Sequence, residues 1–293
     1  MKKVLFYFFI FNLIPIANAQ DIDDLLNEVT NDEITYTSAT FKTGRIINGQ
    51  SVEQTGKNHL DFRISHRFGS VSSGIDNFFG IDQSTIHLSF EYGFSDRLMI
   101  GIGRSSYMKT YDGFVKYKIL RQSTGKRTMP ISLSYFGSTE LFSAPFSDPE
   151  RNNKFSSRLT YIHQLLIARK FNESLSLQLT PTILHKNMVT TVLEMNDLFS
   201  CGIGGRYKLT KRMALSAEYY YTLHFPRSGT DYNNPIALGL DIETGGHVFQ
   251  IMLTNTSIMK EGGFIYGVDN DDFFKGGIHL GFNISRTFSF NKH

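Results

Sequence analysis

IHLGFNISRTFSF, at Ile278–Phe290, alternates apolar and polar side chains at every position except Arg286. Successive side chains of a β-strand point to opposite faces, so this stretch predicts one apolar and one polar face. About ten residues tilted at about 45° are enough for a strand to cross a bilayer. A transmembrane barrel turns the apolar face to lipid and the polar face inward. We therefore predict an all-β fold, a transmembrane antiparallel up-and-down β-barrel of the outer membrane.

The N-terminus has the three parts of a secretory signal peptide. Lys2 and Lys3 supply positive charge, Val4–Ile16 is apolar, and Ala17–Ala19 is an A-x-A cleavage site. The apolar run is too short for a transmembrane helix, which needs about 20 residues. We predict that residues 1–19 are cleaved and that the mature chain is exported to the outer membrane of a Gram-negative bacterium.

The composition excludes several other classes of protein. Cys201 is the only cysteine, which excludes an internal disulfide and a Cys-rich metal site. A net charge of +3 is too small to indicate nucleic-acid binding. The histidines have no H-x-x-x-H or H-E-x-x-H spacing, so we expect no metal, haem or other cofactor. Tyr and Phe, in the absence of Trp, must supply the aromatic girdles of a barrel.

The alternation recurs in twelve segments. They are His59–Phe68, Ser84–Phe94, Arg97–Ser106, Gly113–Arg121, Pro130–Ser138, Phe155–Phe171, Ser174–His185, Asp197–Leu209, Arg212–Phe225, Pro235–Glu243, His247–Thr256 and Gly277–Phe290. The links between them alternate between short ones, such as Ser95-Asp96, and longer ones, such as Gly69–Gln83 and Ser257–Gly276. Outer-membrane barrels have short periplasmic turns and longer extracellular loops. This alternation predicts about 12 strands, with both termini in the periplasm.

The chain is predicted to form one barrel at residues 58–293, preceded by a periplasmic leader or lumen segment at residues 20–57. Counting Phe41–Asn48 as a further strand would give thirteen and start the chain outside, so we do not count it. Phe155–Phe171 is the least regular strand, because Leu165–Ala168 is apolar on both faces. The glycines of CGIGGR (Cys201–Arg206) are expected to permit curvature or leave lumen space.

Four stretches resemble the uncharacterised outer-membrane β-barrel proteins common in the Bacteroidetes. They are ATFKTGRIINGQSVE (Ala39–Glu53), HLDFRISHRFG (His59–Gly69), ALGLDIETGGHVFQIMLTN (Ala237–Asn255) and GFNISRTFSF (Gly281–Phe290). The resemblance covers most of the mature chain and implies the barrel fold, but it implies no activity and no site residues. A terminal Phe is typical of barrels recognised by the outer-membrane insertion machinery, although here three residues follow Phe290.

The inward face is predicted to be polar and charged. Its candidate pore-lining residues are Asp61, Arg63, Arg67, His87, Glu91, Lys116, Lys118, Gln178, Arg206, Lys208, Glu218, Asp241 and Glu243. The basic residues of the first and fourth strands are expected to face the acidic residues of the ninth and tenth across the barrel, as opposed charges orient solutes in pores. We predict a narrow channel for small polar or zwitterionic solutes. The alternative is a plugged structural or docking barrel.

An enzyme is the less favoured alternative. His66 is a polar residue on the outward face, and a regular hairpin would bring Ser84 beside it with Asp82 close. A serine needs a neighbouring base to become a nucleophile, so this arrangement would suit an outer-leaflet acyl hydrolase. No oxyanion donor or flanking motif accompanies these residues. The expected partners are the lipid bilayer, lipopolysaccharide, the insertion machinery and small polar solutes, with no nucleic acid.

Overall fold

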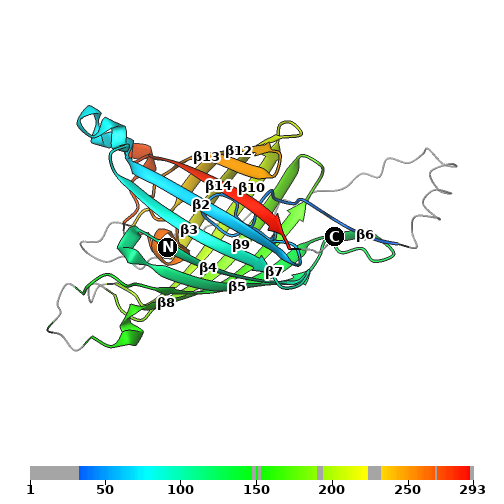
Figure 1. The fold of residues 1–293 in the computed structure, drawn as a ribbon, viewed down its shortest axis with the longest axis horizontal. Helices are drawn as coiled ribbons and strands as arrows, with labels where there is room; N and C mark the ends of the chain where they lie inside the picture. The colour runs from blue at the N-terminus through cyan, green and yellow to red at the C-terminus, as the bar shows by residue number, and fades with distance from the viewer. Residues whose placement is uncertain are drawn as a thin grey trace, which may run out of the picture.

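The computed structural model describes residues 33–146, 150, 153–189, 194–223, 232–267 and 269–290, and these residues form a closed barrel of twelve antiparallel strands (Figure 1). The barrel strands are β2 (His59–Ser70), β3 (Ser84–Gly93), β4 (Leu98–Ser105), β5 (Tyr111–Leu120), β7 (Ser132–Leu141), β8 (Leu159–Lys170), β9 (Leu175–Lys186), β10 (Asp197–Lys208), β11 (Met213–Leu223), β12 (Ile236–Thr244), β13 (His247–Thr254) and β14 (His279–Ser289). The predicted strand number and fold class are confirmed. Predicted signal-peptide residues 1–19 lie outside the described residues.

The barrel closes between its first and last strands. In that seam Ile64 pairs with Ile284 and His59 with Ser289. The four shortest links, β3–β4, β8–β9, β10–β11 and β12–β13, lie at the end where β2 begins and β14 ends, which we call the turn end; the opposite end is the loop end. Phe41–Asn48 is not a barrel strand, as predicted. That the turn end faces the periplasm stays a prediction.

The remaining elements are short. They are β1 (Ile34–Tyr36) and β6 (Ser123–Gly125), which pair at the turn end, the 3-10 turns Val71–Ser73, Ile75–Gly80, Tyr107–Lys109, Phe155–Arg158 and Phe273–Lys275, and the helix α2 (Glu261–Phe264). None of the helices in the described ranges is long and apolar enough to cross a membrane. β8 begins four residues later than predicted, because Phe155–Arg158 makes a turn instead.

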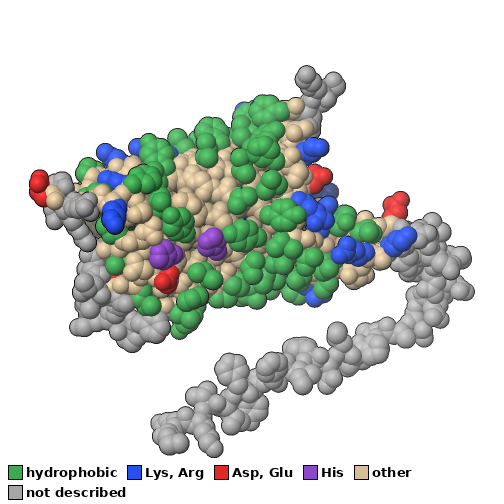
Figure 2. Space-filling view, turned by 90° about the horizontal axis from the view of Figure 1, so that it is seen from below, with side chains coloured by type: hydrophobic (Ala, Val, Ile, Leu, Met, Phe, Trp, Pro, Cys, Tyr) green, Lys and Arg blue, Asp and Glu red, His purple; other side chains and the backbone are tan. Residues whose placement is uncertain are grey.

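Strand β11 illustrates how the sequence determines the two faces. Leu215, Tyr219 and Tyr221 are exposed on the outer wall, whereas Ser216 and Glu218 are buried inside. Apolar side chains can face lipid without burying an unpaired polar group, whereas polar side chains form hydrogen bonds inside the barrel. The outer wall of the barrel is therefore apolar, with charged side chains near its ends (Figure 2).

The two-faced run in β8 has a structural explanation. Leu165 points outward, whereas Leu166 and Ala168 are fully buried inside the barrel. They pack in an apolar cluster with Phe41 and Val52, which come from the chain before β2. This run departs from alternation because part of the lumen is apolar and filled by protein.

We expect Leu179→Arg, at an outward position in the middle of β9, to destabilise the barrel by about 2–4 kcal/mol, the cost of Arg at the bilayer midplane. Leu175→Arg, at the turn end of the same strand, should cost only about 0–1 kcal/mol. Equilibrium urea unfolding in phospholipid vesicles measures both. Equal losses would contradict a lipid-facing outer wall.

Candidate functional site: the filled lumen

Residues 39–57, the inner segment, enter the lumen from the turn end and fold into a tight hairpin. Arg45 and Gln50 form an antiparallel bridge, and the N–H of Ile46 donates to the carbonyl of Gly49 at 2.8 Å. Asn-Gly is a common pair in tight turns. A Cβ at Gly49 would lie 1.9 Å from the Tyr220 hydroxyl, so only glycine fits this turn. The segment corresponds to the lumen-filling alternative.

Glu218 of β11 binds the tip of the hairpin. Its carboxylate accepts backbone N–H bonds from Asn48 at 2.7 Å, Gly49 at 3.1 Å and Ile47 at 3.2 Å. Successive N–H groups that converge on one point form a concavity suited to an anion, and hydrogen bonds to a charged group are stronger than neutral ones. An inward carboxylate of the wall thus serves as the anchor of the inner segment.

Lys116 of β5 binds the same segment through its carbonyl groups. Its ammonium donates to the carbonyls of Gly44 at 2.9 Å, Ser51 at 3.0 Å and Glu53 at 3.2 Å. An ammonium has three donors, and these contacts use all of them. Two charged side chains of the wall therefore hold the inner segment: Glu218 binds its N–H groups, and Lys116 binds its carbonyl groups.

Glycines of the barrel wall make room for the hairpin. A Cβ on Gly204 of β10 would lie 2.4 Å from the Cδ1 atom of Ile46, and a Cβ on Gly239 of β12 would lie 3.2 Å from that of Ile47. Both isoleucines are almost fully buried. Gly204 belongs to the CGIGGR stretch, in which Gly202 and Gly204 leave space inside the barrel and Gly205 faces the outer wall beside Leu177.

The link between β13 and β14, described at residues 255–267 and 269–276, is the cap loop, and its residues 255–267 fill the lumen from the loop end. Lys260 forms an ion pair with Asp112 of β5 at 3.0 Å, and Asp112 also bonds His87 at 2.8 Å. The N–H of Gly262 in α2 donates to Glu140 of β7 at 3.0 Å. The loop is therefore attached to the wall by buried charges.

An apolar cluster holds the rest of the cap loop in place. From the loop come Ile258, Phe264, Ile265 and Tyr266, and from the wall come Ile162, Leu184, Leu198 and Tyr220. The wall members are inward positions that carry apolar residues. The loop end of the barrel interior is therefore built to receive a protein segment.

The two segments meet at Glu261. Its carboxylate binds Arg45 of the inner segment at 2.9 Å, Gln50 at 3.0 Å and its neighbour Lys260 at 3.2 Å. The Arg45 and Glu261 side chains are only 4% and 0% exposed. Burial alone would raise the pKa of Glu261, but Arg45 and Lys260 outweigh it and lower that pKa to about 2. The inner segment and cap loop thus form one continuous filling of the lumen, joined by the buried ion pair between Arg45 and Glu261.

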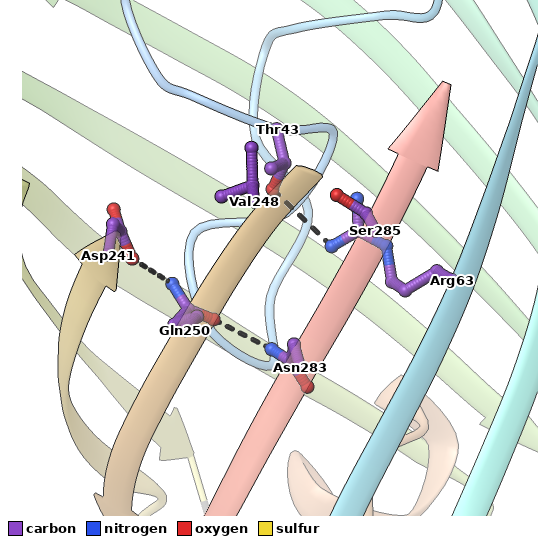
Figure 3. Close-up of a pocket in the computed structure, with 7 residues that line it drawn as sticks. All are labelled: Thr43, Arg63, Asp241, Val248, Gln250, Asn283 and Ser285. Carbon is purple, nitrogen blue, oxygen red and sulfur yellow. Dashed lines mark hydrogen bonds between the residues drawn. The ribbon is translucent and has the colours of Figure 1, made fainter. Parts of the chain in front are cut away.

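Little space remains beside the filling. A small pocket of about 10 Å³ is lined by Thr43, Arg63, Asp241, Val248, Gln250, Asn283 and Ser285 (Figure 3). That volume holds about one water molecule. A larger pocket of about 220 Å³ opens at the turn end beside Lys42, Glu53 and Asp61. In this conformation the described residues block the lumen.

The candidate pore-lining residues differ in burial. Asp61, Arg63, Arg67, His87, Glu91, Lys116, Gln178, Glu218 and Asp241 are buried, and Lys118, Arg206, Lys208 and Glu243 are partly buried. Most of the buried ones contact the inner segment or one another, whereas His87 bonds Asp112, and Asp241 bonds Ser216 and Gln250. Gln178, for example, donates to the carbonyl of Gln50 at 2.7 Å and accepts from Val52 at 2.8 Å. Their role in lining a pore stays a prediction.

The expected opposition of charged walls is wrong for β2. Around the barrel β5 lies six strands from β12, which is directly opposite, but β2 lies only three strands from it. Arg63 of β2 lies close to acidic neighbours instead, 3.4 Å from Asp61 and 3.9 Å from Glu91. The inner segment also separates the two walls, so the charges do not face one another across open water.

The expected His66–Ser84 neighbourhood is also wrong. Across β2 and β3, His66 pairs with Ile86, and Ser84 pairs with Phe68. The His66 ring stacks on Phe282 with 5.1 Å between centroids. The hairpin register therefore places the hydroxyl and the imidazole at different levels of the outer wall.

Alternation did not reveal the residues that fill the lumen. Arg45, Glu261 and Lys260 lie outside the strands, and no periodic pattern surrounds them. The cap loop gave one signal: SIMKEGGFIYG, residues 257–267, is unusually apolar for a solvated loop. Together with the apolar inward face of β8, it indicates an occupied interior.

A family model described as a membrane-bound β-barrel domain (DUF5777) matches residues 41–288. Among solved structures, a NanC porin is 12% identical, covers 80% of this chain and 100% of its own, and has a TM-score of 0.47. An outer membrane channel from Pseudomonas putida F1 is 10% identical over 80% of this chain and 97% of its own, with a TM-score of 0.47. No curated protein sequence is significantly similar to this chain.

We expect Glu218→Gln to loosen the inner segment by about 2–3 kcal/mol, because the amide loses the charge and replaces one acceptor oxygen with a donor. Amide hydrogen exchange at residues 46–50 should then be about 30- to 100-fold faster, with the barrel strands still protected. Glu243→Gln is the matched control, since that carboxylate pairs with Lys42 at the partly exposed turn end. Unchanged exchange in Glu218→Gln would contradict the anchor.

We expect Arg45 and Glu261 to be energetically coupled. Arg45→Met or Glu261→Gln alone leaves a buried charge short of its partner and should destabilise closure of the cap loop by about 3 kcal/mol. The double variant should cost less than the sum by about 1–3 kcal/mol. Hydrogen exchange of residues 256–266 measures this cycle. The exposed pair Lys42–Glu243 should show coupling of only about 0–1 kcal/mol, and a coupling as small for Arg45–Glu261 would disprove the link.

Proposed function

Because the chain belongs to the DUF5777 family of membrane-bound β-barrel domains, we propose that it is an outer-membrane channel closed at rest by the inner segment and the cap loop. Small polar or zwitterionic solutes pass when both segments leave the lumen. In this proposal residues 1–19 are a signal peptide that is cleaved on export, and the insertion machinery assembles the barrel in the outer membrane. The turn end then faces the periplasm, and lipopolysaccharide surrounds the loop end.

One observation supports a channel over a solid anchor: the wall beneath the inner segment is polar. Ser89, Ser134, Gln178 and Ser216 are buried at inward positions, beside Lys116 and other charged residues. Hydrogen bonds to the segment are bonds that water can replace when the segment leaves. A barrel kept permanently full is better stabilised by an apolar interior, because replacing a buried polar pair by apolar groups of similar shape is often stabilising.

A plugged structural or docking barrel is the second candidate. It is supported by the link through Glu261, which joins both segments into one filling. Opening then requires two buried segments to separate, and each protects the other. The two candidates differ in whether an emptied barrel conducts.

Single-channel conductance in a planar bilayer tests the proposal. We expect the refolded mature protein to insert without stable conductance steps. Replacing residues 257–267 or residues 44–53 with a Gly-Ser linker of equal length should leave it silent, since the segment that remains still fills its own end of the lumen. Both replacements together should give discrete steps. A double variant that folds and inserts, shown by heat-modifiable migration on a gel, but stays silent would favour the plugged barrel.

The conducting double variant also tests the charged wall. Arg63→Glu with Lys116→Glu removes two inward positive charges and adds two negative ones, so reversal potentials under a salt gradient should move toward cation selectivity. In the filled protein the same changes disturb the contacts of Thr43 and Gly44, which makes the emptied barrel the proper background. Unchanged selectivity would show that these residues do not line the conducting path.

A further inference from the structure

Two strands end at the turn end with the same outward arrangement. The Arg169 guanidinium lies over the ring of Phe171, 5.1 Å from its centroid, and Arg286 lies 4.9 Å from the centroid of Phe288. Both arginines and both rings are exposed on the outer wall. β8 and β14 are separated around the barrel, so the arrangement occurs at two independent places.

Basic side chains gather at this end on the short links and the outward positions beside them (Figure 2, right). They are Arg97, Arg121, Lys126, Arg127, Arg169, Lys170, Lys211, Arg212 and Arg286. The acidic residues at the same level are Glu33, Asp96, Glu173 and Glu243, and Glu243 pairs with Lys42. Among the described residues at this end the basic ones outnumber the acidic ones, so the described part of the turn end has a net positive charge.

The level of these arginines is fixed by the barrel. Phe171 and Phe288 lie at the edge of the apolar outer wall, where aromatic rings meet lipid headgroups. A ring under the guanidinium orders it at that level, as cation–π contacts do. Within the described part of the chain neither guanidinium pairs with a carboxylate. Its N–H edge is then free for a phosphate, which a guanidinium binds through two parallel hydrogen bonds.

We propose that the turn end is a binding surface for anionic phospholipid headgroups, with Arg169 and Arg286 as two of its phosphate contacts. The phosphate supplies the acceptor oxygens, and the additional net negative charge of the headgroup distinguishes an anionic lipid from a zwitterionic one. Basic residues next to an anionic membrane surface each favour such a lipid about fivefold.

The absence of Trp from the chain allows a direct test. Phe171→Trp creates a single fluorescent reporter and keeps an aromatic ring beneath Arg169. The refolded full-length protein is placed in phosphatidylcholine vesicles that contain equal fractions of either brominated phosphatidylglycerol or brominated phosphatidylcholine. We expect phosphatidylglycerol to be enriched about three- to fivefold at the reporter, measured from the extent of quenching.

Matched variants identify the cause. The enrichment should fall to about onefold in Phe171→Trp/Arg169→Gln and in 1 M salt, which screens the charge. Phe288→Trp with and without Arg286→Gln repeats the test on β14. Phe199→Trp, exposed on β10 beside Asp197 at the loop end, should show no enrichment.

Equal quenching by the two lipids at Phe171→Trp and Phe288→Trp would overturn the proposal, as would an enrichment that neither the glutamine variants nor salt reduces. If Arg169→Gln does not fold, Arg169→Lys keeps the charge, and the salt titration of Phe171→Trp alone decides. These outcomes do not depend on whether the barrel conducts.

Discussion

The structure depends on one constraint: in a narrow barrel with a polar inner wall, the buried charged side chains need partners. The wall of this barrel is charged at several levels, and buried charges are costly unless they are paired and hydrogen-bonded. Glu218 and Lys116 meet this requirement by binding backbone N–H and carbonyl groups of the inner segment. The hairpin needs them equally, because few of its backbone groups have partners of their own. The wall and the inner segment therefore stabilise each other, because each supplies hydrogen-bond partners for polar groups of the other.

The sequence predicts the strands well because the evidence for a strand is local. Each strand alternates on its own, and the bilayer requires the same alternation in all twelve. Ile278–Phe290 is β14 with its ends moved by one residue each, and the expected short link at Ser95-Asp96 lies between β3 and β4. β8 is the exception in both its start and its pattern, since its inward residues pack against protein rather than water.

The interior was less predictable because its contacts join distant parts of the chain. Arg45 and Glu261 are separated by 216 residues, and the sequence around each residue does not predict that it contacts the other. Alternation predicts that Arg63 points inward. Its position relative to β12 depends on the order of the strands around the barrel. Its contact with Thr43 depends on how the inner segment folds inside the lumen. Inward positions derived from alternation alone thus gave an incorrect picture of the electric field inside the barrel. Similarly, a shift of two residues in the register of β2 and β3 separates His66 from Ser84.

The seam between β14 and β2 has a consequence for how the protein is made. It joins the last strand to the first, so it has the longest sequence separation of any pairing in the barrel, and such contacts form slowly. The inner segment directly precedes β2, and Asn58 between them is bonded to both sides: its N–H donates to Gly93 and its carbonyl accepts from Phe290. The cap loop directly precedes β14. The inner segment and the cap loop are thus connected directly to β2 and β14, the two strands whose pairing closes the barrel. Closure of the barrel and insertion of both segments into the lumen are therefore expected to occur together, late in assembly.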